Sequence, residues 1–346
     1  MNKCYKKSSL LLTTLLLGST LLTSCKGLFY VYDTLDYDVC SQSGALSFCL
    51  NAYYDSDKLT IIKDEQELKD AFKGDKYKFI AYDTIKGLDL CEEYGKYTLC
   101  KNYMGGSHTI ISLKENVPSF TNSKKIIANN EKGSLGAIIS YLYPEQVSNI
   151  TYIEDNSRTF YENIVKGKYS EEFDYLIIDQ AFACRLTDET LRKEYSTIVY
   201  AKEYKYVYYD YIKTNERTNL FYPEGGVFVN KEFLSSNYKD CKTFITSCDT
   251  MTDKNVDNVR DTTQIINGEG KVDAQWEKFD LTVYDVLTIG KWELLKDGSY
   301  NKPNLARYTT SFKNSQVKDY LELIGKEYAN LDSIMLEDDY FSKVDN

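Results

Sequence analysis

The segment FYPEGGVFVNKEFL, residues Phe221–Leu234, decides the fold. Its proline and glycines predict a turn, because these residues are the strongest turn formers. The apolar run Gly226–Val229 predicts a strand, and the chain from Lys231 onward predicts a mostly helical region. A turn, a buried strand and a helix are therefore expected in direct succession.

The chain before this segment alternates between strand and helix patterns. The predicted strands are Lys58–Ile62, Tyr77–Tyr82, Lys125–Ala128, Ile150–Ile153 and Phe173–Asp179, and the predicted helices are Ser43–Tyr53, Glu65–Phe72, Leu135–Leu142 and Thr159–Lys166. We also expect strands at Tyr97–Cys100 and His108–Leu113, around a turn at Gly105 and Gly106. Alternating strands and helices predict parallel sheets covered on both faces, which is an α/β fold.

The first 24 residues have the pattern of an export signal. Three lysines precede the apolar stretch Leu10–Leu22, which is too short and too interrupted for a membrane-spanning helix. The exit Leu22-Thr23-Ser24-Cys25 resembles the lipobox of bacterial lipoproteins, which implies that Cys25 receives a palmitate-bearing lipid and becomes the mature N-terminus. We expect a signal peptide at residues 1–24 and a lipid anchor on the extracytoplasmic face of the cell membrane. The alternatives are an ordinary signal peptide with a chance cysteine, or an uncleaved anchor.

Length and charge limit the architecture and the partners. Removing 24 of the 346 residues leaves 322, which exceeds what one core usually supports and favours two lobes. The same cleavage removes three lysines and changes the formal net charge from −10 to −13. Nucleic-acid binding needs clustered lysine and arginine, so no nucleic-acid partner is expected. The scattered acidic residues instead predict a solvated surface.

Nine cysteines and one histidine limit the metal chemistry. The cysteines that follow Cys25 are odd in number, which leaves at least one thiol free: Cys40, Cys49, Cys91, Cys100, Cys184, Cys241 and Cys248. Because no CxxC pair occurs and His108 is the only histidine, a thiolate cluster is the only plausible site for a soft metal. We expect buried free thiols and neither a metal nor another cofactor. Cys241 and Cys248 are the pair to test for a disulfide.

Three segments resemble the solute-binding lipoproteins of ABC importers, in the type II periplasmic-binding-protein fold. The nearest group binds nitrate, sulfonates and thiamine precursors. Phe221–Leu234 is similar to a turn, strand and helix start in that group, and Lys125–Ser134 is similar to its strand, glycine-bearing loop and helix start that face the ligand. Phe173–Gln180 is similar to its strand with an acidic end, although the group often has proline at the position of Gln180. The order and spacing of the segments carry the resemblance, together with the lipobox.

The resemblance implies two α/β lobes, each with a mixed sheet flanked by helices, joined by crossing strands. Residues 25–114 would form the first part of lobe 1, residues 115–220 would form lobe 2, and residues 221–346 would return to lobe 1 and add C-terminal helices. The implied protein is a monomer that captures a small organic solute in the interlobe cleft. It would deliver this solute to the permease of an ABC transporter.

Strand ends and helix starts predict the residues that line this cleft, because open α/β sheets bind ligands at the carboxyl ends of their strands. The candidates are Ser43, Gly44, Asp83, Thr84, Gly106, Ser107, Gly133, Ser134, Asp179, Gln180 and Tyr222. The backbone N–H groups of a helix that starts at Gly133 and Ser134 suit an anion, although Ser134 equally suits an ordinary helix cap. Asp83 and Asp179 favour an amine or a heterocycle N–H, or are solvated turn residues. The sequence is compatible with either ligand charge.

Two further hypotheses share these residues. A bilobal enzyme acting on a small molecule would use Asp83, Asp179 or Glu224 as a base, with help from His108. A surface adhesin lipoprotein would have no small ligand. A single histidine at the start of an apolar strand is more often structural, and the sequence contains no P-loop and no HExxH motif. We therefore expect a binding protein and no enzyme.

Overall fold

The structure is a computed structural model that describes residues 34–53, 56–106, 108–129, 133–153, 155, 157–169, 172–187, 201–206, 222–251 and 312–343. The predicted lipid anchor at Cys25 and the candidate Ser107 lie outside the described residues. Within the described part of the chain, every helix is too short or too polar to cross a membrane.

The first sheet has five strands in the order β2-β1-β3-β10-β4. They are β1 (Val39–Gln42), β2 (Leu59–Ile62), β3 (Phe79–Asp83), β4 (Tyr97–Gly105) and β10 (Pro223–Asn230). β1 runs parallel to β2 and β3, whereas β10 runs antiparallel to β3 and β4. The apolar strand predicted at Gly226–Val229 is thus the inner part of β10, which is buried between β3 and β4.

The second sheet repeats the arrangement in the order β7-β6-β8-β5-β9. Its strands are β5 (His108–Ser112), β6 (Ile126–Asn129), β7 (Ile150–Ile153), β8 (Tyr175–Asp179) and β9 (Lys202–Tyr206). β6 runs parallel to β7 and β8, and β5 runs antiparallel to β8 and β9. In each sheet the fourth strand enters from the other lobe, because β5 follows β4 and β10 follows β9. The chain crosses between two lobes twice, which confirms the predicted two-lobed α/β architecture.

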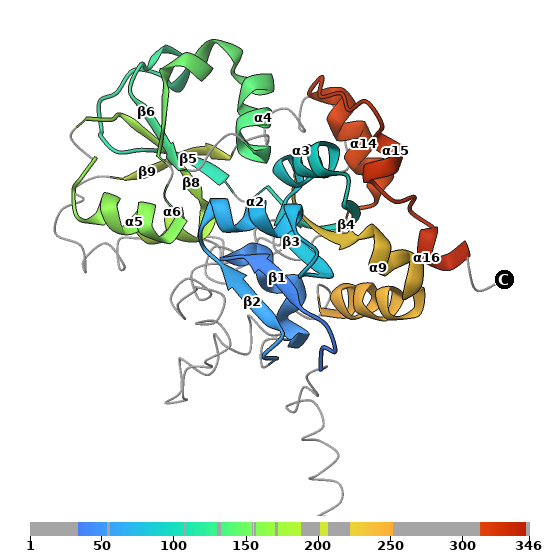
Figure 1. Cartoon of the computed structure of the whole chain (residues 1–346). Coiled ribbons are helices and arrows are strands. Elements are labelled where there is room, and N and C mark those ends of the chain that lie inside the picture. Colours follow the sequence, from blue (N-terminus) through green and yellow to red (C-terminus); the bar gives the residue numbers. More distant parts are fainter. Residues whose placement is uncertain are drawn as a thin grey trace, which may run out of the picture.

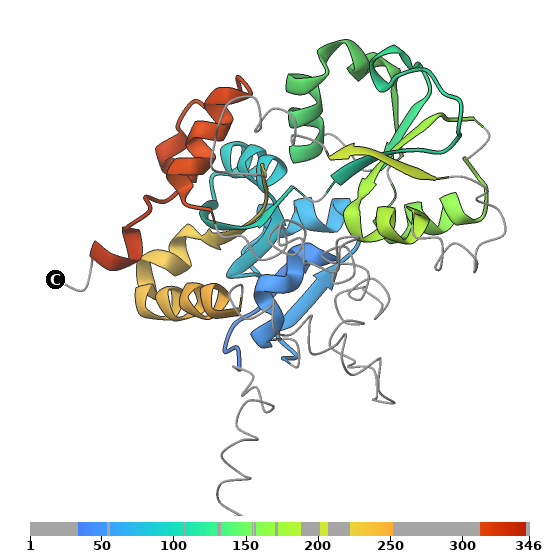
Figure 2. The same cartoon turned by 180° about the vertical axis from the view of Figure 1, so that it is seen from behind.

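Helices cover both sheets. Lobe 1 contains the 3-10 helix η2 (Ala45–Tyr53), α2 (Glu65–Lys73) and α3 (Thr84–Tyr94), and lobe 2 contains η3 (Phe120–Asn122), α4 (Ser134–Leu142), η4 (Pro144–Asn149), α5 (Ser157–Val165) and α6 (Gln180–Thr187). After β10 follow α9 (Lys231–Ser236), a helical stretch at residues 238–251, α14 (Asn314–Leu323), α15 (Leu331–Ile334) and α16 (Tyr340–Lys343). Figures 1 and 2 show these later helices on lobe 1, on the side of β4 and α3.

The structure corrects two expectations about the first crossing. Gly105 and Gly106 do not form a hairpin turn, because β4 and β5 belong to different sheets and this stretch carries the chain between the lobes. Residues 108–112 consequently pair in the second sheet, although the boundary expected at residue 114 assigned them to lobe 1. An apolar strand has the same sequence pattern in either sheet, and its partners β8 and β9 come much later in the chain.

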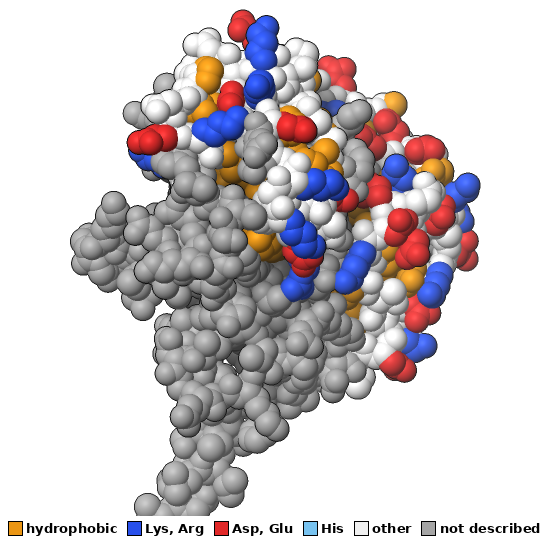
Figure 3. Space-filling view, turned by 90° about the vertical axis from the view of Figure 1, so that its left-hand side faces the viewer, with side chains coloured by type: hydrophobic (Ala, Val, Ile, Leu, Met, Phe, Trp, Pro, Cys, Tyr) orange, Lys and Arg blue, Asp and Glu red, His pale blue; other side chains and the backbone are white. Residues whose placement is uncertain are grey.

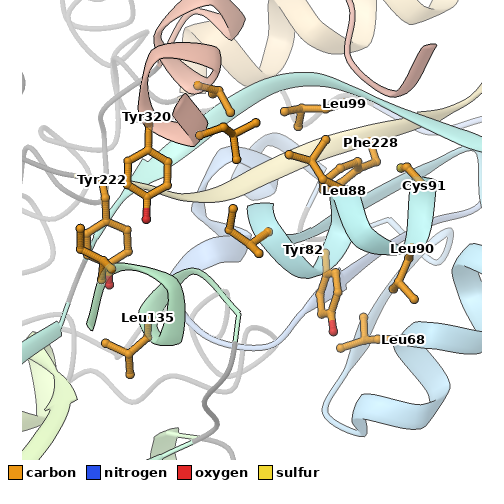
Figure 4. Packing of buried hydrophobic residues seen from close by; sticks show 14 of the residues in the cluster. Leu68, Tyr82, Leu88, Leu90, Cys91, Leu99, Leu135, Tyr222, Phe228 and Tyr320 are labelled. Carbon is orange, nitrogen blue, oxygen red and sulfur yellow. The ribbon is translucent and has the colours of Figure 1, made fainter. Parts of the chain in front are cut away.

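One cluster of buried apolar side chains is shared by the two lobes. It includes Tyr82 and Leu88 of lobe 1 and Leu135 of α4 in lobe 2. Figure 4 shows the rings of Tyr222 and Tyr320 side by side in this cluster, with Leu135 beneath Tyr222. The two rings are stacked, with centroids 6.2 Å apart. Each lobe also has a separate core of its own, so the shared cluster marks where the lobes meet.

Six cysteines in the described residues are free and buried: Cys40, Cys49, Cys91, Cys100, Cys241 and Cys248. Cys241 and Cys248, the pair proposed for a disulfide test, therefore both carry free thiols in this structure. Burial raises the pKa of the Cys241 thiol to about 12, which keeps it protonated and unreactive near neutral pH. On the coloured part of the molecular face in Figure 3, which covers described residues only, acidic and basic side chains are intermixed and hydrophobic side chains show between them.

Candidate functional site between the lobes

Asp83 lies where the two lobes meet. It ends the buried strand β3, and its carboxylate caps α3 by accepting a hydrogen bond from the Lys86 backbone N–H at 2.9 Å. Both carboxylate oxygens also accept from the backbone N–H of Ser134, at 3.1 and 2.9 Å. The Ser134 hydroxyl donates to Oδ1 at 3.0 Å. One carboxylate thus connects the N-terminus of α3 in lobe 1 to the N-terminus of α4 in lobe 2.

Gly133 makes this approach possible. A Cβ atom at this position would lie 2.7 Å from the Asp83 carboxylate, which is closer than side-chain atoms tolerate. Helices α3 and α4 contact one another, and Figures 1 and 2 show them side by side. The predicted glycine-bearing loop and helix start therefore do face the junction of the lobes, where α4 binds an anion that the protein itself supplies.

The charge of Asp83 depends on pH in the physiological range. Burial raises the pKa of its carboxyl to about 6, against the lowering effects of Lys86 and of the hydrogen bonds from Lys86 and Ser134, while Glu224 raises it further. The Lys86 ammonium in turn lies 3.2 Å from Glu65 Oε1, and the Tyr82 hydroxyl donates to the same oxygen. Asp83 is thus ionised at neutral pH but takes up a proton in mildly acidic solution.

His108 forms a second polar group, at the first crossing. It begins β5 directly opposite Asp179, the last residue of β8. Its Nδ1 atom lies 3.2 Å from the Tyr222 hydroxyl and 3.5 Å from Glu224 Oε1. Burial lowers the pKa of His108, but the carboxylates of Glu224, Asp179 and Asp83 together raise it above its ordinary value. Its imidazole is therefore biased toward the charged form.

Gly106 and Tyr222 tie the two crossings together. The Gly106 N–H donates to the Tyr222 carbonyl oxygen at 2.7 Å. A Cβ atom at Gly106 would lie only 2.0 Å from the Tyr222 ring, so the ring packs directly on the backbone of the first crossing. Tyr222 is 1% exposed, which makes it a buried wall of the junction.

The other candidate residues lie at turns and helix starts and make contacts within their own lobe. Thr84 is buried, and its hydroxyl accepts from Asn102 Nδ2 at 2.6 Å, which directs it toward β4. Ser43 donates its backbone N–H to the Ile62 carbonyl oxygen, and Gly44 has a φ of 95°, so both shape the turn between β1 and η2. Gln180 begins α6, and its side chain lies outside the described atoms.

The set of solute-binding residues chosen from the sequence did not include His108 and Glu224, which only the enzyme hypothesis used. Glu224 lies in the second crossing, and Ser134 Oγ is 3.4 Å from its carbonyl oxygen. The turn expected from Pro223 and the glycines is not formed, because Pro223–Gly225 is the first part of β10. The available signal was the position of Glu224 just before the apolar run Gly226–Val229, which puts it at the start of that strand and therefore at the rim of the sheet. Among the described residues, no three His, Cys, Asp or Glu side chains come together as metal ligands.

The strand order and the two crossings define the class of fold, that of the two-lobed periplasmic binding proteins of type II. This confirms the fold that the sequence resemblance implied. The structure is similar to the alkanesulfonate-binding protein SsuA of Xanthomonas axonopodis pv. citri bound to MOPS, with a TM-score of 0.55 and 10% identity over 87% of this chain and 98% of that chain.

Two further solved structures have nearly the same similarity. The zinc-bound ligand-binding component of an ABC-type import system from Staphylococcus aureus gives a TM-score of 0.54 and 10% identity over 87% of this chain and 96% of that chain. A protein of Bordetella bronchiseptica RB50 gives a TM-score of 0.54 and 11% identity over 89% of this chain and 96% of that chain. No family model matches the sequence. No curated protein matches it either.

Proposed function

We propose that this protein is an extracytoplasmic solute-binding lipoprotein that captures a small organic solute between its lobes and delivers it to an ABC transporter permease. The observation that carries the proposal is the meeting of polar groups from both lobes at their junction. Asp83 of lobe 1 accepts from Ser134 of lobe 2, and at the crossings His108 lies beside Tyr222 and Glu224. Lobes joined by two crossing segments can open and close around a ligand. A permease can then distinguish loaded from empty protein by shape.

The proposal assigns solute contacts to the side chains at this junction. Asp179 and Glu224 offer carboxylate oxygens, His108 and Tyr222 offer polar atoms, and Ser134 offers a hydroxyl beside the start of α4. All of them are largely buried in the present conformation. Opening of the lobes would expose them to an entering solute. The other residues expected at strand ends and helix starts complete the proposed cleft: Gly106, Ser107, Gly133 and Gln180. Ser43, Gly44 and Thr84 would contribute only through the local structure that they hold in lobe 1.

The N-terminal sequence supports the proposed location. Export and cleavage before Cys25 would leave a lipid on this cysteine, with residues 26–33 between the anchor and the first described residues. The protein would act as a monomer on the outer face of the cell membrane. We propose residues 25–106 and 221–346 for lobe 1 and residues 107–220 for lobe 2, because β5 at residues 108–112 already pairs in the second sheet.

One observation favours a second candidate, an enzyme with the same fold. Buried titratable groups with shifted pKa values often mark catalytic sites, and Asp83 and His108 are two such groups. The fate of the bound molecule separates the two candidates, because a receptor returns its solute unchanged whereas an enzyme accumulates a product.

A thermal-shift screen followed by calorimetry tests the proposal. The library should contain amines, N-heterocycles, amino acids, sulfonates and nitrate. A solute that binds only the folded protein stabilises it by about 2.7 kcal/mol at a hundredfold excess over Kd. We expect a hit whose affinity falls on Asp179→Asn and on Tyr222→Phe, but not on Asp332→Asn, an exposed control in α15. Consumption of the hit would favour the enzyme, and no hit across the library would favour an adhesin.

A further inference from the structure

We propose that Asp83 is a specificity residue of the interlobe site, because its carboxylate occupies the position at the N-terminus of α4 where an anionic solute would bind. The site would therefore reject sulfonates and other oxyanions and accept a cationic or neutral solute that donates N–H groups. This inference rests on the proposed function, and it names the chemical class of the solute.

The contacts of Asp83 are those of a bound anion. Three of them come from Ser134: the backbone N–H reaches both carboxylate oxygens, and the hydroxyl reaches Oδ1. The first N–H groups of a helix point toward its N-terminus and favour negative charge there. An anionic solute would have to displace a carboxylate that is tethered nearby and therefore has a high effective concentration.

The charges that face this position also oppose an anion. Glu224 of β10 and Asp179 of β8 lie near Asp83, so the junction holds three carboxylates. Among the described residues, the cationic groups that act on Asp83 are His108 and Lys86, and both already face a carboxylate: His108 lies beside Glu224 and Lys86 lies beside Glu65. An anion that entered would meet like charges in a medium of low dielectric constant, where their repulsion is strong. Carboxylate oxygens suit an ammonium group or the N–H edge of a heterocycle instead.

The variant Asp83→Ser provides a direct test. Serine is a good helix N-cap, so α3 keeps its cap while the N–H groups of α4 become available. Titration calorimetry of the full chain with methanesulfonate and with nitrate, at constant ionic strength, should show saturable binding to Asp83→Ser. We expect this binding to be roughly tenfold or more tighter than any binding to the wild type.

Two further variants locate the gained anion. Asp83→Ser combined with Ser134→Pro should lose it again, because proline removes the N–H yet is tolerated in the first turn of a helix. Asp89→Ser, on the outer part of α3 beside Lys326, should behave like the wild type. If Asp83→Ser proves too unstable to measure, Asp83→Asn keeps the cap and should give a smaller gain of the same sign.

The outcomes separate this inference from the proposed function. If the wild type binds methanesulfonate or nitrate tightly, or if the variant gains no anion binding, the specificity role of Asp83 is wrong, whatever solute the protein carries. If the variant gains an anion site but the wild type binds no solute in the library, the specificity role stands and the proposed function fails.

Discussion

Replacing Asp83 with asparagine should change how the stability of the protein depends on pH. The carboxyl of Asp83 has a pKa of about 6 in the folded protein, and aspartate in an unfolded chain has a pKa of roughly 3.9. The folded state therefore binds the proton more readily than the unfolded state. The contribution of Asp83 to stability is largest below about pH 4 and is lost as pH rises through about 6.

The size of the effect follows from the shift. A shift of roughly 2 pKa units at ~1.4 kcal/mol per unit corresponds to ~3 kcal/mol. Asparagine does not ionise, so the free energy of unfolding of the wild type minus that of Asp83→Asn should fall by about this amount between pH 4 and pH 7. The raised pKa of His108 affects both proteins, and most of its contribution cancels in the difference.

Urea denaturation of both proteins at pH 4, 5, 6 and 7 measures this difference. The side-chain oxygen of Asp83→Asn can still cap α3 and accept from Ser134, but its NH2 group replaces one of the two oxygens that accept from the Ser134 N–H. Because asparagine does not titrate, this loss is the same at every pH, and the pH dependence of the difference reports the charge. If the free energy of unfolding of the wild type minus that of Asp83→Asn stays constant with pH, the pKa of Asp83 is not raised in the folded protein. If this free-energy difference rises with pH, the helix N-termini outweigh burial and lower the pKa of Asp83.

Three further predictions concern other parts of the chain. Gly106→Ala should lower the free energy of unfolding, measured by chemical denaturation, by about 1–3 kcal/mol, because the added methyl group would overlap the Tyr222 ring. A change within about 0.5 kcal/mol would contradict the close packing of the two crossings. Cys25→Ala should accumulate as an unlipidated precursor, and unchanged detergent partitioning would count against the lipid anchor. Four buried cysteines should react with iodoacetamide only after denaturation: Cys49, Cys100, Cys241 and Cys248. Mass spectrometry of labelled peptides measures this reaction, and labelling of the native protein would contradict their burial.

Local patterns predicted most of the elements. The strand expected at Ile150–Ile153 is β7, and the helix expected at Glu65–Phe72 is α2, which Asp64 caps by accepting from the Glu67 N–H. The sequence prediction missed α3, which contains Gly87, a poor helix former. The structure explains this glycine, because a Cβ atom there would lie 2.2 Å from the Phe228 ring of β10. Close packing of a helix on a distant strand overrides local propensity, and no local pattern reveals it.

In the candidate site, too, local patterns identified some residues, whereas others depend on contacts between distant parts of the chain. The rule of strand ends and helix starts selected Asp83, Gly133 and Ser134, which the structure brings into contact. The rule did not select His108 and Glu224, because their meeting depends on two crossings that lie side by side but are far apart in the sequence. It left open whether the start of α4 binds an anionic ligand or is only capped by Ser134, whereas in the structure the Asp83 carboxylate from the other lobe occupies that position. Long-range contacts of this kind follow from the topology.

Native mass spectrometry of the gently purified full-length protein would show whether the protein is a receptor for a small solute. We expect one small cationic or neutral molecule per chain, released with unchanged mass on denaturation and bound again when it is added back to the stripped protein. The receptor function would be wrong if the protein carried no small molecule and none returned to it, or if the released molecule were a reaction product of the compound supplied.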